Sequence, residues 1–147
     1  MVLRKLFASN LSPRSTLSLE IIRVSVSILI LIHGTYRLVT GGVAPFGAWL
    51  EAQGVPAGYV FALAVTLIEL VCPLLMVLRR FVSICAIMHI FILTLGIVLV
   101  HAPYGWFVVG AGRNGAEYSV LLIISLASVA WAYAPTMSPD APADKPH

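Results

Sequence analysis

Eight ionisable side chains stand inside long apolar stretches of this sequence. They are Glu20, Arg23, His33, Arg37, Glu69, His89, His101 and Glu117. A charge at the centre of a bilayer costs several kcal/mol, so such residues usually face the interior of a helix bundle and are paired. Carboxylates and imidazoles exchange protons, and guanidinium groups hold anionic or carbonyl oxygens. These residue types indicate proton handling or the binding of a small oxygen-bearing molecule.

The spacing of the first four predicts one polar face on one helix. At 100° per residue, the polar residues between Glu20 and Arg37 fall within an arc of roughly 140°. This stripe must point toward other helices. Glu20 and Arg23, three residues apart, can pair on their own helix. On a later helix, His89 shares its face with Gly96, which is expected to allow close helix approach.

Depth along each helix predicts the partners across helices. At 1.5 Å per residue, Arg37 and Glu117 come out close to the outer surface, which predicts an ion pair between them. Glu69 and His89 both come out near the midplane, which predicts a hydrogen bond. Either pair could be structural, or Glu69 could belong to a proton-handling or quinone-binding site. Pro73 removes the hydrogen bond to the carbonyl of Glu69 and predicts a kink there.

Other cofactors are less favoured by the pattern. Haem ligation by His33 with His89 or His101 is disfavoured because the predicted depths disagree, and no metal or flavin site is evident. Cys72 and Cys85 lie at similar depth and could approach one another, but apolar surroundings make them packing residues.

Composition explains which elements must position these groups. Of the 147 residues, 60% are hydrophobic and 10% are charged, against about 25% charged in soluble proteins. A spanning helix needs roughly 20 apolar residues, and four such segments are present. We therefore predict an all-α fold, a four-helix transmembrane bundle with interfacial outer loops. The predicted spans are residues 17–40, 56–78, 81–101 and 115–134, and Pro56 is expected to begin the second.

The predicted organisation has three parts. Residues 1–16 form a cytoplasmic N-terminal segment, 17–134 the transmembrane domain and 135–147 a disordered cytoplasmic tail. A soluble catalytic domain does not fit within this length.

Basic residues set the expected orientation. Arg4, Lys5 and Arg14 precede the first span, and Arg79 and Arg80 lie between the second and third. Positive charge accumulates on the cytoplasmic side of membrane proteins. Both termini are therefore expected inside, in a bacterial-type plasma (inner) membrane, with loops 41–55 and 102–114 outside.

Two functions that the sequence superficially suggests are excluded. The net charge of +3 lacks the basic stripe with interleaved aromatic residues that nucleic-acid binding requires. Residues 110–115 match the dinucleotide-binding glycine pattern, but they lie between two spans rather than between a strand and a helix.

Taken in order, several of these residues resemble the DoxX family of small four-helix membrane proteins. Arg23 followed by His33-Gly34-Thr35-Tyr36-Arg37 resembles the family's R…H-G-x-x-K. Further carriers are Phe46, Trp49, Gly54-Val55-Pro56, Glu69, His101, Gly105-Trp106-Phe107 and Gly115-Ala116-Glu117-Tyr118. The resemblance covers roughly residues 19–135. Arg37 replaces the usual lysine, and Val71-Cys72-Pro73 stands where glycines are usual.

The resemblance implies a membrane subunit of a redox system, since family members include subunits of thiosulfate:quinone oxidoreductases and of a complex linked to thiol and superoxide defence. We expect a polar pocket that opens toward the outer leaflet and is lined by Arg23, His33, Arg37, Glu69, His101 and Glu117. His33 and Arg37 would bind oxygens of a quinone, while Glu69 and His89 would pass protons.

The expected partners are the lipid bilayer and another redox subunit, with a homo-oligomer left open. Two alternatives remain at this stage, namely a non-catalytic anchor or assembly factor for a redox complex, and a small-molecule permeation protein.

Overall fold

The computed structural model describes residues 13–110 and 114–135, and all regular structure in this part of the chain is helical. The α-helices are α2 (Pro13–Val39), α3 (Val43–Ala52), α4 (Gly58–Val77), α5 (Val82–Gly96) and α6 (Glu117–Ala132). A π-helical turn (Ile97–His101) and a 3-10 turn (Ala102–Tyr104) continue α5. The all-α class predicted from the sequence is confirmed. Arg4, Lys5, Arg113 and the predicted disordered tail from residue 136 onward lie outside the described residues.

Three helical stretches are long and apolar enough to cross a membrane. They are Pro13–Val39, Gly58–Val77 and Val82–Tyr104, with mean hydropathies of 1.9, 2.5 and 2.6. The fourth predicted span corresponds to α6, which has 16 residues and is shorter than the roughly 20 that a span needs. Apolar composition thus gives three candidate spans and one shorter apolar helix.

The predicted helix start at Pro56 is wrong by two residues. Ala57 adopts a left-handed conformation with φ of 55°, so α4 begins only at Gly58. The predicted outer loop 41–55 contains α3, and Phe46, Trp49 and Leu50 lie on this helix.

Close glycine contacts fix α3 against the beginning of α4. A Cβ atom added to Gly58 would lie 2.2 Å from the carbonyl oxygen of Gly47, and one added to Gly47 would lie 2.6 Å from the Cα of Tyr59. Glu51 on α3 accepts the backbone N–H of Gly58 at 3.1 Å. The two backbones touch because neither glycine carries a side chain.

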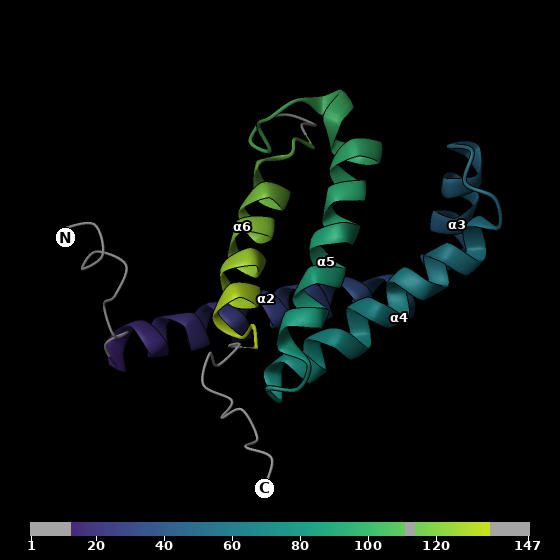
Figure 1. The fold of residues 1–147 in the computed structure, drawn as a ribbon. Helices are drawn as coiled ribbons and strands as arrows, with labels where there is room; N and C mark the ends of the chain where they lie inside the picture. The colour runs from purple at the N-terminus through teal and green to yellow at the C-terminus, as the bar shows by residue number, and fades with distance from the viewer. Residues whose placement is uncertain (1–12, 111–113, 136–147) are drawn as a thin grey trace, which may run out of the picture.

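The helices form two pairs that cross one another (Figure 1). α2 packs chiefly against α4, and α5 against α6. The pairs meet around a core of buried apolar residues, among them Ile30, Met76, Leu126 and Val129. Large apolar residues also point outward, Trp131 with 87% of its surface exposed. An apolar exterior of this kind suits lipid rather than water.

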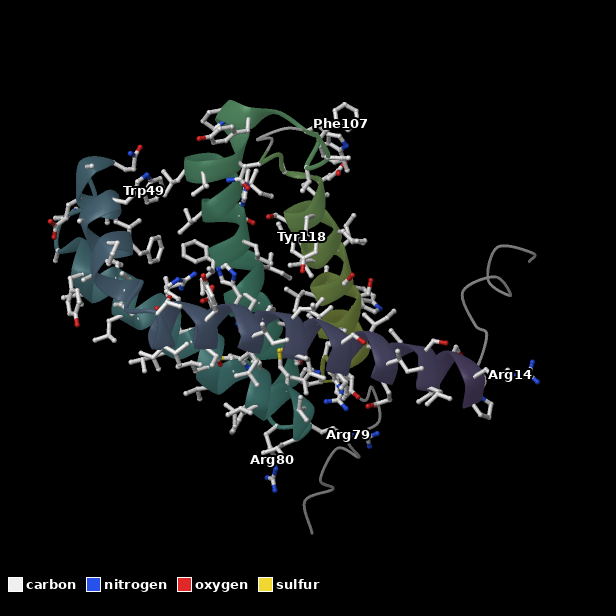
Figure 2. All side chains as sticks on the ribbon, turned by 180° about the vertical axis from the view of Figure 1, so that it is seen from behind. Arg14, Trp49, Arg79, Arg80, Phe107 and Tyr118 are labelled. Atoms are coloured by element: carbon white, nitrogen blue, oxygen red, sulfur yellow. The ribbon has the colours of Figure 1, made fainter. Side chains whose placement is uncertain are left out.

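Three arginines and two aromatic residues lie toward opposite sides of the molecule. Figure 2 places Arg14, Arg79 and Arg80 toward one side and Trp49 and Phe107 toward the other. Basic residues on one side are the pattern expected of a cytoplasmic surface.

Candidate functional site

An ion pair between α2 and α4 forms the centre of the site. Arg37 lies near the C-terminal end of α2 and donates to Oε2 of Glu69 at 2.7 Å and to Oε1 at 3.5 Å. The two side chains are only 15% and 8% exposed. Thr66, one turn before Glu69 on α4, lies 3.4 Å from the same guanidinium. A buried charge pair is therefore neutralised across the two helices.

His33 extends this pair toward the surface. Its Nε2 lies 2.9 Å from a terminal nitrogen of Arg37. A guanidinium has only donors, so Nε2 must accept and the ring proton must sit on Nδ1. His33 is exposed, whereas Glu69 is buried. The arrangement leaves an N–H donor on an exposed ring, held in place by a buried ion pair.

An aromatic ring from α3 covers the guanidinium. The Arg37 guanidinium carbon lies 4.7 Å from the centre of the Phe46 ring, a cation–π contact. Phe46 in turn stacks on Trp49, with ring centres 6.2 Å apart. The sequence predicted interfacial outer loops, but it gave no indication that Phe46 would face Arg37. The role of Thr66 was missed too.

A missing side chain brings the two helices together at this point. A Cβ atom added to Gly34 would lie 2.8 Å from Cβ and 3.3 Å from the carbonyl oxygen of Glu69. That carbonyl is the one left without its helical partner by Pro73. α4 continues as one helix through Pro73, and the predicted kink stays a prediction.

Both predicted pairs between helices are wrong. Glu69, rather than Glu117, binds Arg37, and Glu117 accepts the backbone N–H of Val108 at 3.1 Å. His89 donates from Nδ1 to its own helix, to the carbonyl of Cys85 at 2.8 Å. The predicted pairs were chosen by depth in the membrane alone. Whether two side chains at equal depth can meet also depends on the direction in which each one leaves its helix. Glu69 faces α2 and is therefore unavailable to α5.

His89 consequently stands apart from the site. It is 1% exposed, and its buried Nε2 has no hydrogen-bond partner within residues 13–110 and 114–135. The close helix approach predicted at Gly96 is also wrong, because a Cβ atom there would meet nothing within 4 Å.

Arg23 belongs to a second cluster at the end of α4 that carries Met76 and Val77. It pairs with Glu20, as predicted, and donates to the carbonyls of Met76 and Val77. These are the last carbonyls of α4, where a cation is favourable. Glu20 also binds Arg79 at 3.2 Å and accepts the hydroxyl of Tyr133. This cluster fastens α2, α4 and α6 together.

His101 and Glu117 belong to a third cluster, at the loop between α5 and α6. His101 Nδ1 contacts the carbonyl of Asn114 at 2.7 Å. The backbone N–H groups of Ala116 and Glu117 bind the carbonyls of Gly105 and Trp106 at 3.0 Å. The six residues expected in one pocket are thus divided, since only His33, Arg37 and Glu69 are brought together.

The cysteines lie in one apolar core, which agrees with their similar predicted depth. Cys72 and Cys85 are free and buried, and both belong to the core cluster that also contains Met76 and Leu126. Within the described residues, no group of three or more histidine, cysteine, aspartate or glutamate side chains could hold a metal ion.

Comparison with known protein families gives a match over much of the sequence. The DoxX family model matches residues 18–102, more than half of the chain and including His33, Arg37 and Glu69. The chain belongs to the DoxX family. No curated protein and no solved structure matches it significantly. Membership in DoxX, a membrane family, agrees with the apolar helices and makes this chain an integral membrane protein whose helices contact lipid.

Proposed function

We propose that this DoxX protein is the membrane subunit of a quinone-linked redox system. One observation carries the proposal, namely that Arg37 is shared between the buried carboxylate of Glu69 and Nε2 of exposed His33. The sharing leaves the Nδ1–H of the exposed His33 ring as a donor that can bind a carbonyl oxygen. A quinone is a neutral, lipid-soluble molecule with two such oxygens.

The residues around the ion pair fit a quinone better than an anionic substrate. The positive charge of Arg37 is already balanced by Glu69 at 2.7 Å and covered by the ring of Phe46. The pair as a whole carries no net charge. An uncharged ligand therefore gains a hydrogen bond from His33 without competing for Arg37.

Reduction of a quinone consumes two electrons and two protons. In this proposal His33 donates to a carbonyl oxygen of the quinone, and Arg37 fixes the orientation of the His33 ring. The buried carboxylate of Glu69 accepts and releases protons. Electrons would come from a partner subunit. We assign no proton transfer to His89, because its Nδ1 is bound to Cys85 and its Nε2 has no partner in the described part of the chain.

The proposal includes four membrane crossings, with α6 as the fourth, and cytoplasmic termini in a bacterial-type inner membrane. The hairpin of α4 and α5 carries Arg79 and Arg80 on the side opposite to Trp49 and Phe107 (Figure 2). α6 runs beside α5 over its length (Figure 1). If α5 crosses the membrane, α6 therefore crosses it as well.

The test uses the whole chain, purified in mild detergent from native-type membranes. Quinone extracted from the wild-type protein should be present at a substantial fraction of one per chain. His33→Ala should reduce this amount at least tenfold with an unchanged thermal midpoint, because His33 is exposed and the Arg37–Glu69 pair remains. Tyr36→Ala is the matched control, since Tyr36 is also exposed on α2 at 69%. Absence of quinone, or equal retention in His33→Ala, would overturn the proposal.

A non-catalytic anchor or assembly factor is the second candidate. The cluster of Glu20, Arg23, Arg79 and Tyr133 favours it, because that cluster joins three helices without offering a free group. In this case His33→Ala would leave complex recovery and quinone content unchanged, whereas Arg23→Leu would lower recovery of the complex.

A further inference from the structure

A partly open groove of about 210 Å³ lies between α3 and the outer end of α5, apart from the three polar clusters. The groove is lined by Trp49 on α3, by Gln53 directly after α3 and by Asn114 before the beginning of α6. The π-helical turn contributes Leu99 and Val100, and the 3-10 turn contributes Pro103 and Tyr104. Trp49 and Phe107 share one side of the molecule (Figure 2), which places the groove at the aromatic outer surface.

The side chains that line the groove are aromatic, aliphatic or neutral amides, which favours an uncharged ligand. Among residues 13–110 and 114–135, no charged side chain lines the groove. Trp49 and Tyr104 supply aromatic faces, while Gln53 and Asn114 supply side-chain amides that can donate N–H groups. Neither amide is bound to another group within the described residues. The combination fits a planar neutral molecule that stacks on a ring and accepts hydrogen bonds at its edge.

One hydrogen bond and one π-helical turn shape the lining. His101 binds the backbone carbonyl of Asn114 at 2.7 Å. The end of α5 continues as a π-helical turn, a form that occurs frequently at functional sites. The groove therefore lies beside backbone that His101 connects to Asn114.

Aromatic stacking connects the groove to the ion-pair site. Trp49 lines the groove and stacks on Phe46 at 6.2 Å. Phe46 covers the Arg37 guanidinium at 4.7 Å, and Arg37 holds His33. A molecule on Trp49 is thus separated from the ion-pair site by one aromatic ring.

We propose that this groove binds the ring of a neutral quinone arriving from the outer leaflet, before the ring reaches His33. Trp49 stacks on the quinone ring, and the amides of Gln53 and Asn114 donate to its carbonyl oxygens. The inference rests on the proposed function and adds to it a second site with its own selectivity for uncharged rings.

Fluorescence of single tryptophans tests the groove directly. The chain has three tryptophans, so Trp106→Phe with Trp131→Phe leaves Trp49 alone. This full-length variant, in nanodiscs of neutral lipid, is titrated with a short-chain benzoquinone, which quenches nearby indoles. Quenching of Trp49 should saturate, and Gln53→Leu or Asn114→Leu should raise the half-saturating concentration at least fivefold. A carboxylated benzoquinone should bind at least fivefold more weakly.

The matched control keeps only Trp131, through Trp49→Phe and Trp106→Phe. Trp131 lies near the far end of α6 and is 87% exposed, so it reports quinone dissolved in lipid and should show linear quenching. The proposed quinone site in the groove would be wrong if quenching of Trp49 were linear. It would also be wrong if quenching saturated but Gln53→Leu and Asn114→Leu left the half-saturating concentration unchanged.

Failure of the groove and failure of the proposed function give different results. If the amount of extracted quinone depends on His33 while quenching of Trp49 is linear, the groove does not bind quinone but the proposed function is supported. If Trp49 quenching saturates but quinone retention does not depend on His33, the ion-pair site is lost instead.

Discussion

Arg37 is the residue on which the electrostatics of the site depend. Its guanidinium satisfies a buried carboxylate, fixes the tautomer of an imidazole and lies under an aromatic face. A lysine could supply the charge but not this planar set of donors. Arginine at this position therefore lets one side chain hold both Glu69 and His33.

Removal of Glu69 tests this pairing. Glu69→Leu should lower the free energy of unfolding by about 3–5 kcal/mol, because it leaves Arg37 unpaired in a largely buried place. The double variant Arg37→Leu with Glu69→Leu should recover most of the loss. Thermal unfolding in detergent measures both, with Glu117→Gln as a control near the outer loop. A double variant less stable than Glu69→Leu would contradict the pairing.

At the scale of elements, close backbone contact positions the site. Gly34 lets α2 approach α4 at Glu69, and Gly47 with Gly58 lets α3 approach α4. The second contact brings Phe46 over Arg37. Interhelical glycines are common in membrane proteins because helices associate there through close packing.

A methyl group at Gly34 should separate α2 from α4. Gly34→Ala is expected to cost about 1–3 kcal/mol, the usual range for overpacking, since the added Cβ would lie 2.8 Å from Cβ of Glu69. Gly96→Ala is the matched control, because its Cβ would meet nothing within 4 Å. Thermal midpoints of the two variants should differ clearly, and equal midpoints would show that α2 and α4 are not in contact at Gly34.

At the scale of the whole molecule, the crossing pairs place Arg79 and Arg80 on the side opposite to Trp49 and Phe107. The cluster around Glu20 joins α2, α4 and α6, whereas no comparable polar cluster of described residues joins α3 to α5. The groove lies where that connection is lacking.

Accessible cysteines test the orientation and the fourth crossing. Gln53→Cys should react with a membrane-impermeant maleimide in intact cells, whereas Arg80→Cys and Ala134→Cys should react only after lysis. The native Cys72 and Cys85 are buried and provide the unreactive background. Labelling of Ala134→Cys in intact cells would show that α6 does not cross the membrane. If Arg80→Cys reacted in intact cells and Gln53→Cys only after lysis, the orientation would be the opposite of the proposed one.

The sequence by itself determined the helical class, the membrane environment and the inward turn of most polar residues, because hydrophobic periodicity and charge depletion depend only on residue type. It also predicted the Glu20–Arg23 pair, which follows from spacing on one helix. Only the tertiary structure decided that Arg37 meets Glu69, that His89 stands alone and that Phe46 covers the site. Those contacts depend on how helices are rotated and how closely they approach, and here glycine contacts between helices set both.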